Sequence, residues 1–174
     1  DPQRWLYYSG MVPEYLGGVY EKDDIRIDLA RLADAAGVTF VREPATALDP
    51  DARTVTTASG TEMSFDVLGI DVGGVNPSVP DGAVASKPIY RIGDLEPPVR
   101  RTLSDPAASL RLVVVGGGAA GTEVALNLTG RFAGAGRSAD LTLTVVEQAD
   151  QLLPGFPAGM RSYAAGLLRD RGAT

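Results

Sequence analysis

Cysteine and histidine are both missing from the 174 residues of this sequence. The chain therefore supplies no thiol nucleophile, no dithiol redox pair, no zinc site and no histidine general base. Basic residues are also in the minority, with 16 Lys and Arg against 22 Asp and Glu, which gives a net charge of −6. Nucleic acids and anionic membranes bind basic surfaces, so both are disfavoured as partners.

Long apolar runs are missing as well. The longest, such as residues 112–115, is far shorter than the ~20 residues that cross a bilayer, so we expect no transmembrane segment. The first residues, DPQRWLYYSG, lack the basic start and apolar centre of a signal peptide. A cytoplasmic location is the default expectation, and a whole enzyme held peripherally at the membrane is the alternative. Hydrophobic residues make up 44% of the chain, enough for the packed core of one medium domain or two small ones.

One amphipathic helix is predicted in the first part of the chain. Residues 24–36 place their apolar side chains on a single stripe at helical spacing. Asp23 or Asp24 would cap its start, and Gly37 stands where a left-handed residue ends a helix. Residues 1–20 show no convincing period and are predicted to form a loop or short turns.

Several short strands follow this helix in the sequence. Turn residues at 49–51 and 59–60 separate segments with strand character. We predict strands at residues 38–41, 53–57, 62–66 and 67–72. The last of these reads as a buried strand that ends at Gly73, so the segment is interpreted as a small antiparallel meander that leads into a core strand.

Prolines mark a connecting segment between residues 75 and 110. They are Pro77, Pro80, Pro88, Pro97, Pro98 and Pro106. We place a domain boundary near residues 77–88, and we expect Pro97 to open a short helix that runs to Leu103.

A strand–helix–strand unit follows this linker. Residues 111–115 and 141–146 have strand character, and residues 119–133 form a helix between them. A final helix is predicted at 158–171. The first strand runs into LVVVGGGAAGTE, which contains the spacing Gly-x-Gly-x-x-Gly.

The three glycines of this spacing are Gly116, Gly118 and Gly121. In a dinucleotide-binding turn the first glycine makes the tight turn, the second lets the backbone approach the pyrophosphate, and the third lets the helix pack closely. The helix N-terminus then offers free N–H groups to the phosphates. The alternative reading is a glycine-rich turn that only packs a helix on a sheet.

Two carboxylates accompany the glycine turn. Glu147 ends the second strand, 26 residues after Gly121, where it can accept hydrogen bonds from the adenosine ribose. A carboxylate there repels a 2′-phosphate, which favours NADH over NADPH. The alternative is a solvated side chain. Glu123, in the first turns of the helix, either faces the nicotinamide or is favoured there only by the helix dipole.

The order of these motifs resembles a known superfamily. YSGMVPEYLGGVY, the helix, the meander, FDVLGIDVGG, the proline linker, VVVGGGAAGTEVALNL and VVEQADQLLPGFP follow one another as in the FAD-dependent pyridine nucleotide-disulfide oxidoreductases. The similarity is closest to the branch related to type II NADH dehydrogenases and to the oxidoreductase domain fused to selenide, water dikinase. It covers nearly the whole chain.

The resemblance implies an α/β fold and two nucleotide-binding portions. The expected fold is a Rossmann-like three-layer nucleotide-binding fold with a small antiparallel β-meander. Residues 1–80 correspond to part of an FAD-binding domain without its first βαβ unit, and residues 81–174 to part of an NAD-binding domain. Both portions are expected to be incomplete at the ends of this sequence, as in an internal piece of a longer enzyme.

The resemblance also implies residues near the flavin cofactor. Gly73 would lie near the FAD, residues 8–13, with Pro13 at their end, would lie close to the flavin, and residues 40–45 would pass the adenine. Plain core packing is the alternative for each. The cofactors implied are FAD and NAD(H).

The implied activity is hydride transfer from NAD(P)H to FAD and onward to a small-molecule acceptor such as a quinone. Disulfide reductases of this superfamily need a redox cysteine pair, which this sequence lacks. The alternative is a regulatory module that binds NAD(H) without turnover. A homodimer is left open, because exposed sheet edges favour pairing with another chain.

Overall fold

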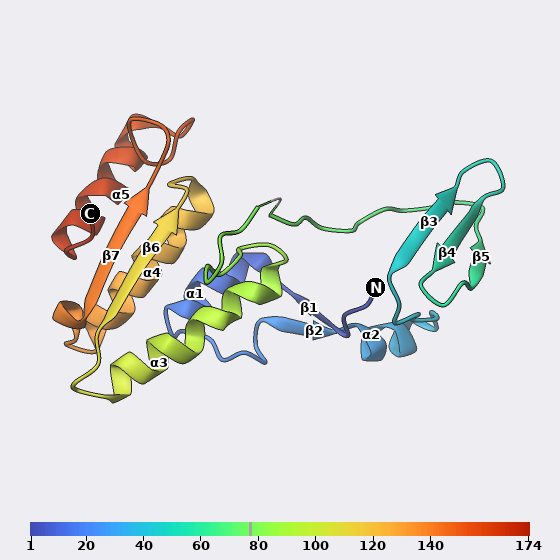
Figure 1. Cartoon of the computed structure of the whole chain (residues 1–174), viewed down its shortest axis with the longest axis horizontal. Helices are drawn as coiled ribbons and strands as arrows, with labels where there is room; N and C mark the ends of the chain where they lie inside the picture. The colour runs from blue at the N-terminus through green and yellow to red at the C-terminus, as the bar shows by residue number, and fades with distance from the viewer. Residues whose placement is uncertain (77) are drawn as a thin grey trace. The chain divides into compact units, whose positions relative to one another are not determined.

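The computed structural model describes residues 1–76 and 78–174 and divides the chain into two compact units. The first unit comprises Asp1–Tyr8 and Arg26–Val75, and the second comprises Ser9–Ile25 and Asn76–Thr174. Figure 1 labels the elements of both units. Pro77, one of the prolines with which the sequence marks the domain boundary, lies outside the described residues.

A two-stranded ribbon and a helix begin the first unit. Strand β1 (Trp5–Tyr7) pairs antiparallel with β2 (Arg26–Asp28), and α2 (Leu29–Ala36) follows directly. The helix thus begins later than predicted, because residues 26–28 pair with β1. Its N-cap is Asp28, whose carboxylate accepts hydrogen bonds from the N–H groups of Ala30 and Arg31.

Helix α2 ends where the sequence predicts. Gly37 adopts the left-handed conformation, with φ of 66°. The next N–H, that of Val38, donates to the carbonyl of Ala33 at 2.9 Å. The predicted strand at 38–41 is therefore wrong, since these residues close the helix instead of pairing in a sheet.

A meander is present in the first unit, but it agrees with the prediction only in part. Strands β3 (Ala45–Asp49), β4 (Thr54–Thr57) and β5 (Glu62–Ser64) form an antiparallel sheet in that order. Strands β4 and β5 fall within the predicted strands at 53–57 and 62–66, whereas the sequence analysis missed β3. The Asp49 carboxylate accepts bonds from the N–H groups of Asp51 and Ala52, which shapes the first turn.

Residues 67–72 do not form the buried strand that the sequence predicts. None of the described strands pairs with this segment. Val67 is 90% exposed and Val72 is 86% exposed. A run of apolar residues becomes a buried strand only when neighbouring strands accept its hydrogen bonds and cover its faces, and the described part of the chain places no such neighbours there.

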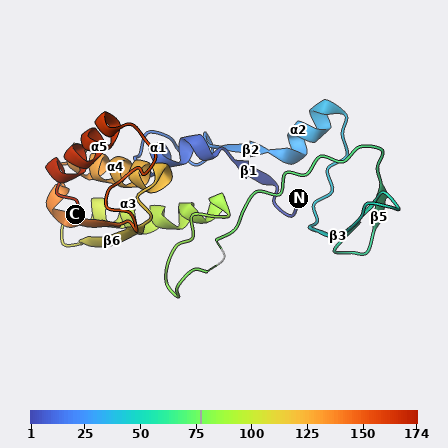
Figure 2. The same cartoon turned by 90° about the horizontal axis from the view of Figure 1, so that it is seen from above.

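The second unit starts with a short helix that the sequence analysis missed. A 3₁₀ turn (Ser9–Met11) leads into α1 (Val12–Leu16), and Pro13 stands in its first turn. The helix is too short to show a periodic pattern, but its side chains are largely buried, and Leu16 is fully buried. It packs against α4, as Figure 2 shows.

The proline-rich linker contains two helical segments. A 3₁₀ helix, η2 (Ile89–Leu95), continues into α3 (Glu96–Ser104). The prediction that Pro97 opens a helix is confirmed.

The strand–helix–strand unit is present as predicted. Strands β6 (Leu110–Val115) and β7 (Leu141–Val146) are parallel, with Val115 opposite Val146. Helix α4 (Ala119–Gly134) crosses between them and packs on the sheet, and α5 (Ala158–Asp170) packs beside α4 (Figure 1). The core of this unit is centred on the buried face of α4, which includes Ala125, Leu128 and Phe132.

Candidate functional site

The glycine turn lies at the carboxyl end of β6, where β6 and β7 lie side by side. The N–H of Gly116 donates to the carbonyl of Val146 at 2.8 Å, so the turn begins at the last paired residue. Gly116 has φ of 105°, a conformation open to glycine and strained for other residues. Gly118 is the N-cap of α4. The turn therefore points the helix N-terminus out of the end of the parallel pair.

The spacing of the other two glycines is explained by what a side chain would meet. A Cβ placed on Gly121 would lie 1.8 Å from the carbonyl oxygen of Gly116, so the helix approaches the turn too closely for any other residue. A Cβ on Gly118 would meet no atom within 4 Å. The surface at Gly118 is open to a ligand, as a backbone that approaches a pyrophosphate requires.

The Glu147 carboxylate is held beside this turn. One oxygen accepts from the N–H of Gly117 at 2.6 Å, and the other accepts from the N–H of Ala149 at 3.0 Å. These backbone bonds, from Ala149 first and then Gly117, lower the pKa of Glu147. Each oxygen keeps a lone pair for a further donor, such as a ribose hydroxyl.

A segment after Glu147 packs against the turn and was missed by the sequence analysis. The N–H of Leu153 donates to the carbonyl of Gly117 at 2.7 Å, and Leu153 is buried with φ of 53°. A Cβ on Gly117 would come within 2.5 Å of the Leu152 side chain. The available signal was the pair of leucines in QLLPGFP, five and six residues after Glu147, but a leucine with positive φ is not predictable from residue type.

Glu123 lies on the exposed face of α4, one turn beyond the glycine loop. The backbone carbonyl of Glu123 accepts a bond from the side chain of Asn127 at 3.0 Å. The exposed carboxylate is thus available at the end of the helix where the glycine turn lies.

Pro13 and Gly73, the residues that the resemblance assigns to the flavin side, belong to different units. Pro13 is buried in α1, whereas Ser9 and Gly10 just before it are exposed. Gly73 is exposed, has φ of 66° and has no atom within 4 Å of an added Cβ. Both assignments to FAD stay predictions.

A groove in the first unit runs beside the segment that leads to Gly73. Its volume is about 600 Å³, and residues 68–72 line it together with the start of β3, including Pro44 and Ala45. The residues that the resemblance places at the adenine thus share one groove with the residues before Gly73. The lining is mainly apolar side chains and backbone.

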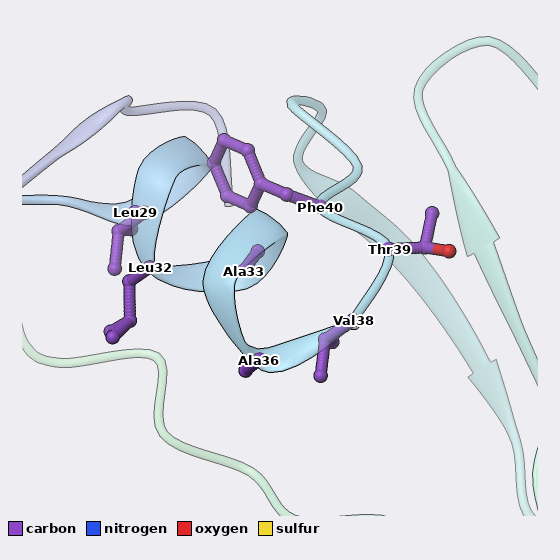
Figure 3. A pocket seen from close by; sticks show the side chains of 7 residues that line it. All are labelled: Leu29, Leu32, Ala33, Ala36, Val38, Thr39 and Phe40. Atoms are coloured by element: carbon purple, nitrogen blue, oxygen red, sulfur yellow. The ribbon is translucent and has the colours of Figure 1, made fainter.

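A second groove, of about 320 Å³, follows the apolar stripe of α2. Figure 3 shows Leu29, Leu32, Ala33 and Ala36 along the helix, with Phe40 folded over one end. This lining brings no acid, base or nucleophile to the groove.

The described residues contain no group of three acidic residues that could hold a metal ion. They also contain no helix long and apolar enough to span a membrane.

The glycine turn, the helix that it starts and the acid at the end of β7 agree with a match to a family profile. The profile of the pyridine nucleotide-disulphide oxidoreductases matches residues 2–174. The chain belongs to this family. The α/β, Rossmann-like fold class predicted from the sequence is thereby confirmed, including the small antiparallel sheets beside a parallel one.

Relatives fall within the flavoprotein branch that the resemblance indicates. A sulfide-quinone reductase of Aquifex aeolicus is 38% identical over 69 residues, which are 38% of this chain and 16% of the relative. An NADH dehydrogenase-like protein of Mycobacterium tuberculosis is 34% identical over 131 residues, which are 65% of this chain and 30% of the relative. The chain thus spans less than a third of the length of these curated relatives.

A solved structure shares the fold over almost the whole chain. NDH2 of Plasmodium falciparum, in complex with NADH, superposes with a TM-score of 0.76 at 13% sequence identity. The match covers 99% of this chain and 41% of that protein.

Proposed function

We propose that this chain is part of a flavoprotein oxidoreductase that transfers hydride from NADH to FAD and passes the electrons to a small-molecule acceptor such as a quinone. The observation that carries the proposal is the glycine turn with Glu147 bonded to its backbone at 2.6 Å. An added Cβ would meet no atom within 4 Å at Gly118, whereas it would clash with the backbone at Gly121. Dinucleotide binding requires free backbone surface at the second glycine of the motif and close helix packing at the third. In this proposal residues 81–174 supply NAD contacts and residues 1–80 supply FAD contacts.

The residues of the second unit fit the dinucleotide. The pyrophosphate would lie against Gly118 and the N-terminus of α4, where free N–H groups and the helix dipole favour negative charge. Glu147 would accept hydrogen bonds from the ribose hydroxyls with the lone pairs that Gly117 and Ala149 leave free. The exposed Glu123 would lie towards the nicotinamide end.

The position of Glu147 supports a preference for NADH over NADPH. Its lowered pKa keeps the side chain ionised at neutral pH. A 2′-phosphate in the same place would meet this fixed negative charge, and Asp150 follows three residues later in the sequence.

The residues proposed for FAD contribute surface and backbone rather than acid–base groups. In the second unit, the exposed residues before Pro13 are proposed to contact the flavin. In the first unit, Pro44 and Ala45 of the groove are proposed to contact the adenine, and Gly73 is proposed to lie near the FAD. When bound, FAD accepts the hydride and supplies the redox chemistry. The task of the chain is to bind, orient and shield the two cofactors.

A quinone is the acceptor that one relative's name suggests. The relative from Aquifex aeolicus is a sulfide-quinone reductase. The absence of cysteine from this sequence means that its own residues supply no sulfur relay, so direct transfer from flavin to acceptor is the simplest proposal.

The test is anaerobic reduction by NADH of the purified full-length protein that contains this chain, because the chain by itself is expected to be inactive. A yellow, FAD-loaded preparation should be bleached by NADH, and adding a quinone should restore the flavin absorbance. NADPH should bleach it more slowly at equal concentration. A preparation that binds NADH but takes up no FAD would instead support a regulatory module without turnover, and one that binds neither would reject the proposal.

A further inference from the structure

A half-buried arginine joins three segments of the second unit far from the glycine turn. Arg131 lies in the last part of α4, and its side chain is only 14% exposed. The guanidinium donates two bonds to the Glu96 carboxylate, at 2.8 and 3.0 Å, and a third to the carbonyl of Leu16, at 2.8 Å. It therefore ties the end of α1 and the start of α3 to one place on α4.

Glu96, the partner of Arg131, is buried, with a side chain 8% exposed. It accepts a further bond from Arg100 at 2.6 Å, and Arg100 in turn pairs with Glu21. The pair between Arg131 and Glu96 is bidentate, because each of the two terminal guanidinium nitrogens donates to a different carboxylate oxygen. Lysine carries the same charge but cannot make this paired contact.

The turn after α1 fits the same face of α4. A Cβ on Gly18 would come within 2.9 Å of the Arg131 guanidinium, and a Cβ on Gly17 within 2.7 Å of the Asn127 side chain. Asn127 and Arg131 are one turn apart on α4, and Glu123 precedes them by one more turn. The end of α1 therefore packs against the C-terminal part of one face of α4, and Glu123 lies on the N-terminal part of the same face.

The inference rests on the proposed function. In that proposal, this arrangement connects the segment assigned to the flavin with the segment assigned to NADH. The residues just before α1 are those proposed for the flavin, and the N-terminus of α4 is the proposed nicotinamide dinucleotide site. Arg131 is about 20 Å along the helix from Gly118, at about 1.5 Å per residue, so it does not reach the dinucleotide itself. We propose that Arg131, through Glu96 and Leu16, is a positioning residue that fixes the flavin-side segment at the correct distance from the nicotinamide side.

A contribution to the free energy of unfolding is a weak explanation for the ion pair between Arg131 and Glu96. Replacing a buried ion pair by apolar side chains of similar size is often neutral for the free energy of unfolding, because both charges lose their hydration on burial. Hydride transfer, in contrast, depends steeply on geometry, and a misplacement of about 1 Å can reduce a rate by about 100-fold. The proposal therefore predicts a larger effect on the rate of flavin reduction than on the NADH affinity.

The test compares Arg131→Lys with the wild-type protein, both loaded with FAD. Stopped-flow absorbance gives the rate of flavin reduction at saturating NADH, titration gives the NADH Kd, and visible circular dichroism reports the surroundings of the flavin. We expect the rate to fall at least ~10-fold and the flavin dichroism to change, while the NADH Kd stays within ~2-fold. Arg101→Lys, on the exposed side of α3, is the matched control and should leave all three unchanged.

A second variant keeps the comparison informative if Arg131→Lys does not fold. Glu96→Gln retains the shape of the carboxylate but removes its charge. Because Arg131 then has no counter-charge, we expect a lower melting temperature, and the folded variant should show the same separation between rate and affinity. The proposal is overturned if the folded variants reduce flavin as fast as the wild type, or if rate, affinity and melting temperature all fall together. A wild-type protein that binds no FAD, or whose FAD is not reduced by NADH, would reject the proposed function itself and this inference with it.

Discussion

The glycines of the turn differ in how much space surrounds them. Gly118 and Gly121 belong to the same sequence pattern, yet an added Cβ has open space at the first and lies 1.8 Å from a backbone oxygen at the second. The same motif therefore contains one position with open space around it, which we propose for a ligand, and one where the packing requires glycine.

A substitution at Gly118 should weaken NADH binding with only a modest loss of stability. Gly118→Leu replaces a favourable N-cap residue by a poor one, which should cost about 1 kcal/mol of folding free energy, but it meets no steric clash because its surroundings are empty. The added side chain occupies the space proposed for the pyrophosphate, so the NADH Kd should rise at least ~10-fold, about 1.4 kcal/mol. Calorimetric titration measures the affinity. Gly134→Leu, at the far end of the same helix, is the control.

Gly121→Ala should reduce the free energy of unfolding more than it reduces the affinity for NADH. The methyl group must displace the turn or the helix, which typically costs about 1–3 kcal/mol of folding free energy. Chemical denaturation measures this cost directly. A Gly121→Ala protein as stable as the wild type would contradict the close approach of α4 to Gly116.

Glu147 should show no titration near neutral pH. Backbone bonds from Ala149 and Gly117 lower its pKa in the folded protein. Its stabilising contribution is therefore present above the ordinary glutamate pKa and is lost only as the pH falls through the lowered value. The NADH Kd should thus stay constant within ~2-fold between about pH 5.5 and 8. An affinity step within that range that disappears in Glu147→Gln would contradict this assignment.

At the scale of elements, α2 shows how a helix start is chosen. The sequence analysis predicts Asp23 or Asp24 as the cap, and this is wrong, because the helix starts later and its N-cap is Asp28. Its carboxylate caps the helix and also pairs with Arg4 of the β1 side at 2.7 Å. Arg4 is the main reason that the pKa of Asp28 falls to about 2.

This double role predicts a pH-dependent stability. The folded pKa of Asp28 is depressed, so its pairing with Arg4 stabilises the protein above about pH 4 and is lost as the pH falls towards 2. Asp28→Asn keeps a good cap but removes the charge. Its melting temperature should lie below that of the wild type at pH 6, and the difference should shrink towards pH 2. Asp34→Asn, on the exposed face of α2, is the control.

Elements with local signals were predictable from the sequence, and those fixed by distant contacts were not. The strand, glycine turn and helix from 110 to 134 carry their own period and turn residues, as does the end of α2 at Gly37. In contrast, α1 is too short for a period and is held by contacts with α4. Residues 67–72 have the composition of a buried strand, but composition does not supply the neighbouring strands that burial requires.

Arg131 and Leu153 mark the limit of sequence reasoning at the site. Nothing in the sequence near Arg131 points to its partner, because Glu96 is 35 residues away in the chain. The left-handed backbone of Leu153 is imposed by its bond to Gly117 and has no signature in the residue itself. Sequence patterns located the glycine turn and its acid, whereas the contacts that hold them in place required the fold.

At the scale of the whole molecule, the net charge of −6 acts on every anionic ligand. NADPH carries an additional phosphate compared with NADH, so it is repelled more by the long-range field and by Glu147. Salt screens charges beyond about 10 Å at 0.1 M ionic strength, but screens a close contact much less. The proposed preference for NADH should therefore have a salt-dependent part from the net charge and a salt-resistant part from Glu147.

These two parts can be separated with one variant and two salt concentrations. Raising NaCl from about 20 mM to about 300 mM should bring the NADPH Kd closer to that of NADH without making them equal, because the Debye length shortens from more than 20 Å to less than 8 Å. Glu147→Gln should narrow the remaining gap at high salt, since it removes the charge nearest the 2′ position. Calorimetric titration with both coenzymes gives the four values needed for each protein. Equal affinities for NADH and NADPH at low salt in the wild type would show that Glu147 does not face the ribose.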